Sequence, residues 1–453
     1  MPRPRFTRRG FLGRSALATA GAVSLLGPDR SAKAQASAGK RRFVAAMMGT
    51  GNRGQWLLRE ELCKWPELEF AYLSDVDPAR LAAAGKLVES MTGKRPRLVS
   101  DFRRMLDDKN VEVFFNTTPD HWHALGTILA CQAGKDVYVE KPASHSPWEG
   151  RKMVEAARKY QRVVQVGTQT RSGEYTQAAV EYVRSGRLGK VHYARVLNMK
   201  ERGNLAILPP APPPEGVDYD AWLGPAPKRA FNPNRFHYAW NWYWDYSGGD
   251  IINDGVHQVD AARFLIGKRY PKAVQATGGQ FHKANEHEAP DTQTVTWDFD
   301  DLTMVFEMTL WTPYMKKMPW ELRDTDDYPN WPFDGMRIEL YGEKGLMFFE
   351  RHGGGWQVFD ESEKVIAQRN DHHPHVPHIR NFLKCVETRQ RPNADIEEGH
   401  LSTLLCQMGN ISYRLGGRKL VLDGEKERFV QDDEANSYLK RTYREPWVVP
   451  EEV

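Results

Sequence analysis

Between residues 43 and 166, short apolar runs alternate with longer segments whose apolar positions follow a helical period. The runs Phe43–Met48 (FVAAMM) and Val111–Thr117 have the length of buried strands. This alternation predicts an α/β fold, a doubly wound parallel sheet with helices on both faces. Further strands are expected at Glu69–Leu73, Val137–Glu140 and Val163–Val166, and helices at Gln55–Trp65, Asp120–Ala133 and Pro147–Tyr160.

The later part of the chain has a different pattern, in which apolar and polar residues alternate with a period of two. That period is typical of strands with one buried face. The chain is therefore predicted to continue into an α+β domain. Its strands are expected at Val191–Met199, Ala273–Gly278, Gln293–Phe299, Met304–Leu310, Arg337–Tyr341 and Leu346–Phe349, and its helices at His378–Thr388 and Gly399–Leu415.

A glycine-rich turn follows the first strand directly and precedes a helix. Its sequence, Gly49-Thr50-Gly51-Asn52-Arg53-Gly54, has the G-x-G-x-x-G spacing of a dinucleotide-binding turn in the required context. Gly49 permits the tight turn, Gly51 lets the backbone approach a pyrophosphate, and Gly54 lets helix and strand pack closely. The helix N-terminus offers free N–H groups to the phosphates. A purely structural glycine turn is the alternative.

The second strand ends at Ser74-Asp75, and Asp75 lies 21 residues after Gly54. An acidic residue near this spacing binds the ribose diol of NAD. A carboxylate there repels the 2′-phosphate of NADP, so NAD is favoured. Ser74 and the later Arg80 keep NADP open as an alternative.

Three later strands also end in polar motifs. They are Thr117–His123, Glu140-Lys141-Pro142 and Gly167-Thr168-Gln169. Because ligands bind at the carboxyl ends of parallel strands, these motifs predict one shared site. Asp120 alone could instead be a helix cap. The residues expected to hold the cofactor are Gly49, Thr50, Gly51, Asn52, Arg53, Gly54, Asp75, Thr118, Pro119, His123, Glu140, Lys141 and Gln169.

The composition fits a globular protein of two or three domains. The chain has 453 residues, of which 40% are apolar and 27% charged. Its four cysteines lack CxxC spacing, which argues against a disulfide scaffold and a zinc ribbon. An apolar run of about 18 residues is missing from the sequence, so no transmembrane helix is expected.

Residues 1–34 have the order of a secretory signal. The twin-arginine pattern Thr7–Leu12 is followed by the Ala/Gly-rich stretch Ser15–Gly27 and by the cleavage pattern Ala32-Lys33-Ala34. We expect export to the periplasm by the Tat machinery; a disordered basic tail or a short anchor is the alternative. Without this segment the chain has 56 basic and 58 acidic residues, so its charge gives no reason to expect nucleic-acid binding.

Together with the segment Gly248–Asp260 (GGDIINDGVHQVD), these motifs resemble those of the Gfo/Idh/MocA oxidoreductase family, whose members include glucose–fructose oxidoreductase and inositol dehydrogenases. The resemblance implies a C-terminal domain with a large open, mainly antiparallel sheet that forms the substrate floor and the contact of a homo-oligomer, a dimer or tetramer. It implies no metal. The expected boundaries are 40–166 for the Rossmann domain, 167–430 for the C-terminal domain and 431–453 for a tail.

Lys141 and His257 are the first candidates for proton transfer. At a buried strand end, desolvation lowers the pKa of a lysine and lets it shuttle a proton, the role that the resemblance also implies for Lys141. A helix starting near Asp254 would place His257 and Asp260 on one face, so that Asp260 could orient the imidazole or meet substrate. A surface lysine and a structural histidine are the alternatives.

The sequence departs from the family at residue 253. Four residues before the histidine the family often has aspartate, and this chain has Asn253 with Asp254 beside it. Asparagine cannot take a proton, so Asn253 is expected to bind a substrate hydroxyl. Asp254 is a further catalytic candidate, although adjacent helical residues point about 100° apart.

The segment Phe236–Tyr246 holds seven aromatic residues in eleven. Aromatic faces stack on sugars, so His237, Trp240 and Trp242 are expected to contact a carbohydrate. An apolar cluster or an oligomer contact is the alternative. The histidine-rich segment Asp371–His378 has metal-like spacing, but it lacks cysteine and contains prolines, so we expect no metal there.

Three functions are compatible with these residues. The first is an exported NAD(P)-dependent oxidoreductase that keeps its nicotinamide bound and acts on a sugar, polyol or sugar derivative. The second is a redox-neutral glycosidase or lyase that works through transient oxidation of a sugar. The third is a non-catalytic sugar-binding protein.

Overall fold

The computed structural model describes residues 41–203, 205–282 and 286–453, and residues 42–453 form one compact unit. The predicted signal, residues 1–34, lies outside the described residues. Among the residues described, none of the helices has both the length and the apolar character needed to cross a bilayer.

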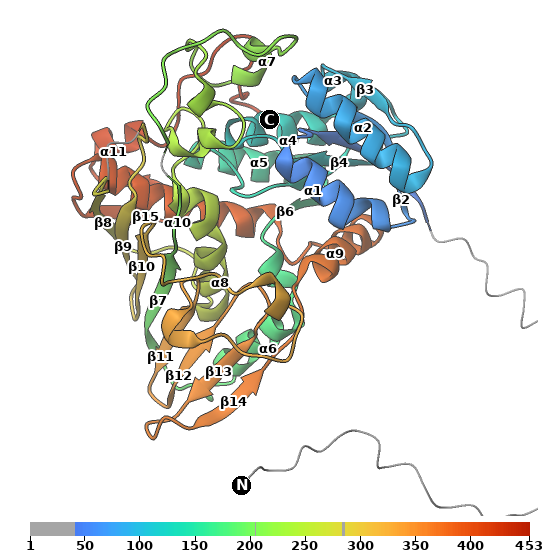
Figure 1. The fold of residues 1–453 in the computed structure, drawn as a ribbon. Helices are drawn as coiled ribbons and strands as arrows, with labels where there is room; N and C mark the ends of the chain where they lie inside the picture. Colours follow the sequence, from blue (N-terminus) through green and yellow to red (C-terminus); the bar gives the residue numbers. More distant parts are fainter. Residues whose placement is uncertain (1–40, 204, 283–285) are drawn as a thin grey trace, which may run out of the picture. The chain divides into compact units, whose positions relative to one another are not determined.

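The first sheet is wholly parallel and has the strand order β3-β2-β1-β4-β5-β6 (Figure 1). This confirms the doubly wound fold. Its strands are β1 (Phe43–Met48), β2 (Leu68–Ser74), β3 (Arg97–Val99), β4 (Val113–Asn116), β5 (Asp136–Val139) and β6 (Val164–Val166). Its helices are α1 (Asn52–Glu60), α2 (Pro78–Thr92), α3 (Arg103–Leu106), α4 (Asp120–Gln132) and α5 (Pro147–Lys159).

Successive residues of β1 serve opposite faces of this sheet. Phe43, Ala45 and Met47 pack with α1 and α2, whereas Ala46 and Met48 pack with α4 and α5. Burial on both faces explains why the strand is an unbroken apolar run.

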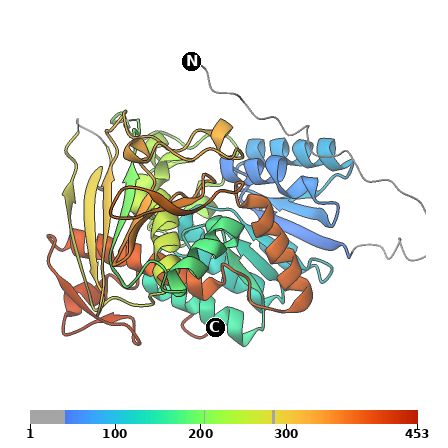
Figure 2. The same ribbon diagram turned by 90° about the horizontal axis from the view of Figure 1, so that it is seen from below.

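The second sheet has ten strands in the order β14-β13-β12-β11-β7-β10-β9-β8-β15-β16. All neighbours are antiparallel except β7 and β10, which confirms the expected mainly antiparallel sheet. Figure 2 shows several of its strands running lengthwise side by side, with helices beside the sheet. The strands are β7 (Val191–Met199), β8 (Ala273–Gly279), β9 (Thr292–Asp298), β10 (Thr303–Thr309), β11 (Ile338–Gly342), β12 (Gly345–Phe349), β13 (Trp356–Phe359), β14 (Val365–Arg369), β15 (Leu420–Asp423) and β16 (Arg428–Phe429).

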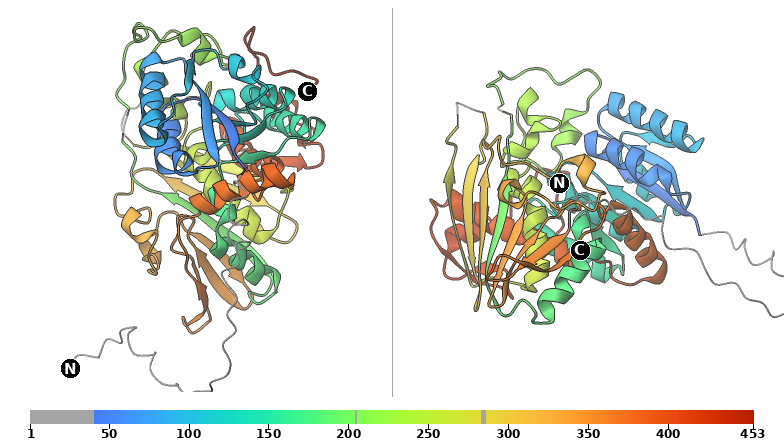
Figure 3. Two further views of the ribbon diagram at one scale, coloured as in Figure 1. Left: turned by 90° about the vertical axis from the view of Figure 1, so that its right-hand side faces the viewer. Right: turned by 60° about the horizontal axis from the view of Figure 1, so that its bottom comes forward.

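The helices of the later half pack against both sheets. They are α6 (Glu174–Arg184), α7 (Tyr219–Leu223), α8 (Val256–Ile266), α9 (His375–Thr388), α10 (Ile396–Arg414) and α11 (Asp433–Ser437). Residues of α6, α8 and α10 share one apolar core with the second sheet. Ile379 and Phe382 of α9 instead pack with α1 on the first sheet (Figure 3), and Val449 and Val453 pack on its other face. The chain beyond residue 167 therefore contributes to both cores.

Candidate active site

A cavity of about 390 Å³ lies at the carboxyl ends of β1, β2, β4 and β5. Its opposite wall comes from residues 236–253, which precede α8 in the later half of the chain. Motifs that are far apart in the sequence therefore meet here, as the polar strand ends predict. The predicted site residues that line it are Gly49, Gly51, Asn52, Arg53, Asp75, Thr118, Pro119, Glu140, Lys141, His237, Trp240 and Asn253.

Two glycines of the turn have no room for a side chain. Gly49 has a φ of +88°, and a Cβ there would lie 2.8 Å from the carbonyl of Thr117. A Cβ on Gly54 would lie 2.3 Å from the carbonyl oxygen of Gly49. Helix α1 begins at Asn52, earlier than predicted, and no side chain caps it at Gly51. Its first-turn N–H groups therefore remain available to a phosphate, and the turn fits a dinucleotide.

Asp75 stands at the end of β2, beside the glycine turn. Its carboxylate accepts hydrogen bonds from the Thr50 N–H at 2.6 Å and the Thr50 hydroxyl at 3.1 Å. Burial raises the pKa of this carboxyl group above its usual value. Asp75 thus holds the glycine turn in place through Thr50, and it also lines the cavity.

Lys141 lies between the two halves of the cavity wall. Its ammonium group donates to the carbonyl oxygen of Asn253 at 2.5 Å and to the Asn253 amide oxygen at 3.2 Å. Burial lowers the pKa of Lys141. Glu140, which is 4% exposed, accepts from Arg53 Nε at 2.8 Å and so holds the loop on which Lys141 lies.

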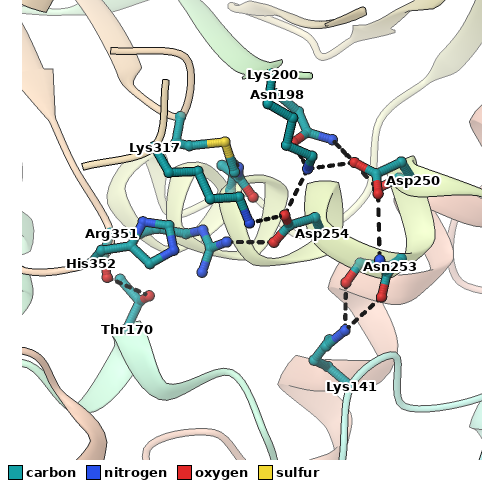
Figure 4. Close-up of polar contacts among 12 residues, drawn as sticks. Lys141, Thr170, Asn198, Lys200, Asp250, Asn253, Asp254, Lys317, Arg351 and His352 are labelled. Carbon is teal, nitrogen blue, oxygen red and sulfur yellow. Dashed lines mark hydrogen bonds and ion pairs between the residues drawn. The ribbon is translucent and has the colours of Figure 1, made fainter. Parts of the chain in front are cut away.

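Asn253 and Asp254 lie in a π-helical turn, Ile251–Gly255, that leads into α8. Asn253 faces the cavity, whereas Asp254 forms ion pairs with Lys200 at 2.6 Å and Arg351 at 2.5 Å (Figure 4). These neighbours hold the pKa of Asp254 well below its usual value. Asp254 is therefore no proton acceptor, and the structure does not support a direct catalytic role for it.

His257 follows one turn later and is 8% exposed. Burial, with the charges of Arg351 and Lys141, holds its pKa well below the ordinary value. The imidazole is therefore neutral, its protonation is disfavoured, and it does not line the cavity.

Asp260 does not orient His257, contrary to the interpretation from spacing. It is fully buried, and both its carboxylate oxygens accept from Arg171 Nε at 2.9 Å. Ser402 donates to it at 2.6 Å. Asp260 thus anchors α8 to the segment after β6 and to α10, away from the predicted substrate contact.

His123 and Gln169 also differ from their predicted roles as cofactor contacts. The ring nitrogens of His123 lie 2.6 Å and 2.9 Å from the carbonyl oxygens of Pro142 and Thr118, so the ring joins two cavity loops from behind. Gln169 donates to the Tyr138 hydroxyl at 3.1 Å. Neither lines the cavity. Both position the loops that do.

The aromatic segment divides between cavity and core. Trp240 lines the cavity, but Trp242 is 3% exposed and stacks on His287 with ring centroids 4.3 Å apart. His237 also lines the cavity, and its ring lies 3.5 Å from Asp77, which follows β2. Of the three predicted sugar contacts, His237 and Trp240 therefore line the cavity and Trp242 does not.

The histidine-rich segment serves packing. His378 is fully buried and contacts the Ser172 hydroxyl at 2.9 Å, and His373 stacks on His375 at 4.0 Å. The described residues contain no group of three or more potential metal ligands.

Asp120 is a site residue whose importance the sequence did not reveal. Its carboxylate does not cap α4; it accepts from the Ser247 hydroxyl at 2.5 Å. It is 3% exposed and also lines a second cavity of about 350 Å³. Burial raises the pKa of Asp120 to about 7.

Asp120→Asn is expected to change the pH dependence of stability. The pKa of Asp120 is about 7 in the folded protein and about 4 in the unfolded chain. The free energy of unfolding therefore falls as the pH rises from about 4 to 7, because over this range the unfolded carboxyl group is ionised while the folded one keeps its proton. The uncharged variant escapes this cost. Its free energy of unfolding relative to the parent should therefore rise by up to roughly 4 kcal/mol between pH 4 and pH 8. Urea unfolding of the cofactor-free proteins at both pH values measures this; a difference independent of pH would contradict it.

Comparison with protein families identifies two regions. A model described as "Oxidoreductase family, NAD-binding Rossmann fold" matches residues 43–168. A second, described as "Oxidoreductase family, C-terminal alpha/beta domain", matches residues 199–306 and 334–449. Both belong to one family, and together they cover more than half of the chain.

Individual relatives are distant. The uncharacterized oxidoreductase YrbE of Bacillus subtilis is 22% identical over 307 residues, which cover 67% of this chain and 73% of that protein. Myo-inositol 2-dehydrogenase of Thermotoga maritima is 22% identical over 312 residues, or 67% and 78%. The crystal structure of an aldose-aldose oxidoreductase from Caulobacter crescentus matches with a TM-score of 0.63 at 19% identity, covering 84% of this chain and all of that one. At this level of identity, the match to the Caulobacter crescentus structure shows a shared fold and nothing further.

Proposed function

Because the chain belongs to the Gfo/Idh/MocA oxidoreductase family, with an NAD-binding Rossmann domain, we propose that it transfers hydride between a firmly held NAD and a hydroxyl-bearing carbon of a sugar, polyol or sugar derivative. One observation carries the proposal. The glycine turn and Lys141 line the same cavity, whose opposite wall holds Asn253 and Trp240. A turn that fits a dinucleotide and a partly buried lysine thus share one cavity.

The residues of the chain divide the work in this proposal. The glycine turn and the first turn of α1 hold the dinucleotide, and Asp75 faces its ribose. NAD bound there supplies the hydride acceptor. Lys141, whose pKa is lowered by burial, exchanges a proton with the substrate hydroxyl, and His257 is the second candidate for this transfer. Asn253 orients Lys141, and Trp240 offers an apolar face to the sugar.

The direct test is nucleotide binding followed by turnover. Mass spectrometry of nucleotide released from the native protein should find NAD, and titration of cofactor-free protein with NADH should give saturable fluorescence. Gly49→Ala should abolish this binding, because the added methyl group meets the Thr117 carbonyl at 2.8 Å. A sugar screen should then show a change in nicotinamide absorbance. If the protein does not bind NADH, the proposal is wrong. Glycoside cleavage without net formation of NADH would favour the redox-neutral alternative.

Export through the twin-arginine pathway is part of the proposal. It rests on Arg8 and Arg9 within the pattern Thr7–Leu12, outside the described residues. Changing both arginines to lysine should leave the protein in the cytoplasmic fraction, whereas the parent should reach the periplasm. The homo-oligomeric state also stays a prediction.

A further inference from the structure

A cluster of four cations lies beside the catalytic lysine. We call Lys200, Arg202, Lys317 and Arg351 the cation cluster. Within 4 Å these side chains form ion pairs with only two carboxylates of the described residues, Asp250 and Asp254. Four basic side chains therefore share two carboxylates, which leaves an excess of positive charge in the cluster.

The surrounding acids do not remove this excess. Glu350 hydrogen-bonds to the ring of His352 at 2.7 Å, and Asp334 accepts from the Met336 N–H; neither forms an ion pair with the cation cluster. Burial raises the pKa of Glu350 to about 8 and that of Asp334 to about 7, which favours their neutral forms.

Two nitrogen atoms of the cation cluster also lack a hydrogen-bond acceptor within the described part of the chain. The Nε groups of Arg202 and Arg351 are buried and have no acceptor among the described residues. Burial, together with the neighbouring cations, lowers the pKa of Lys317 to about 7 even though Asp254 is in contact. Burying unpaired charge is costly, so an arrangement like this one is typical of a site that receives an anion.

The cation cluster is joined to the candidate active site by direct contacts (Figure 4). Lys141 donates to Asn253, whose amide lies 3.4 Å from Asp250, and Asp250 contacts Lys200 at 2.5 Å. Arg202 donates at 2.7 Å to the Tyr238 hydroxyl, and Tyr238 lines the cavity. The side chains of Lys317 and Arg202 are 33% and 22% exposed, so a ligand can reach them.

We infer that the substrate is an acidic sugar, whose carboxylate or phosphate binds the cation cluster while the reacting hydroxyl meets Lys141. The inference rests on the proposed function and narrows its substrate class. A carboxylate or phosphate would accept charge-assisted hydrogen bonds from the exposed cations and offset their excess charge. A neutral sugar would leave that excess in place.

Calorimetric titration of the NADH-loaded protein tests the inference. The probes are D-glucuronate, D-galacturonate, D-gluconate and glucose 6-phosphate, with D-glucuronamide and D-glucose as uncharged counterparts. We expect at least one acid to bind about tenfold or more tightly than its uncharged counterpart. Preference for a uronate or for the phosphate identifies the anionic group. Equal or weaker binding of all the acids overturns the inference.

Lys317 offers the sharpest variant, because Asp254 keeps Lys200 and Arg351 when this lysine is replaced. Lys317→Gln should weaken binding of the acid about tenfold or more and leave D-glucuronamide unaffected. Lys317→Arg should restore the affinity. The matched control is Lys316→Gln, which removes the same charge from the exposed neighbouring residue; it should leave the affinity unchanged. An equal loss in both Gln variants, or in neither, would refute a specific anion site.

The two levels of the argument fail separately. NADH titration reports the proposed function, and the acid–amide comparison reports the substrate class. If the protein binds NADH and oxidises neutral sugars but discriminates against acids, the proposed function stands and only the inference of an acidic substrate is wrong. If the protein binds no NADH, the proposed function is wrong.

Discussion

Replacing Lys141 with methionine is expected to lower kcat by about a hundredfold to ten-thousandfold, the usual contribution of general acid–base catalysis. Methionine keeps most of the length and apolar volume of the lysine stem, so the cavity wall should remain. The ammonium group that donates to Asn253 is lost, and with it the group placed to exchange a proton with the substrate. The measurement is the steady-state rate on the sugar found in the screen.

Two controls separate chemistry from misfolding. The NADH dissociation constant of Lys141→Met should stay within a fewfold of the parent value, because the glycine turn and Asp75 are untouched. Lys152→Met removes a lysine that pairs with Glu155 at 2.7 Å on α5, outside the lining of the active-site cavity, and should keep full activity. Unchanged kcat in Lys141→Met would move the proton-transfer role elsewhere, first to His257.

The sequence predicted those parts of the fold that depend on local patterns. The run Phe43–Met48 is a strand with these same limits, because burial on both faces demands continuous apolar residues. The glycine turn was predictable because its steric need is local: Gly49 has to take a positive φ against the backbone of Thr117. The position of Lys141 was predictable because it follows a strand, and parallel strands direct their carboxyl ends to one edge of the sheet.

The errors concern contacts between distant parts of the chain. Helical spacing makes His257 and Asp260 neighbours but does not tell which side chain competes for the carboxylate. That competitor is Arg171, 89 residues away. The cation cluster was missed for a related reason. Lys200, Lys317 and Arg351 come from separate strands and loops and meet only around Asp254, and no local pattern marks them.

Asp260→Asn is expected to lower the free energy of unfolding by about 3 to 5 kcal/mol, the cost of breaking a buried ion pair by removing one partner. Arg171 is 2% exposed, so water cannot replace the lost charge, and the asparagine amide replaces one of the two acceptor oxygens by a donor that the guanidinium group cannot satisfy. Arg171 keeps Glu398 at 3.2 Å, which should let the variant still fold. Urea unfolding of parent and variant measures the loss.

The same variant decides between a structural and a catalytic role for this carboxylate. If Asp260 only anchors α8, kcat and its pH profile should match the parent in protein that is fully folded at low temperature. Asp300→Asn is the control, because Asp300 pairs with Lys272 where both side chains are more than half exposed, and such surface pairs contribute about 0–1 kcal/mol. A shifted pH profile in Asp260→Asn, with stability unchanged, would return Asp260 to the site beside His257. It would also mean that the contact with Arg171 contributes little to the packing of α8, which its full burial argues against.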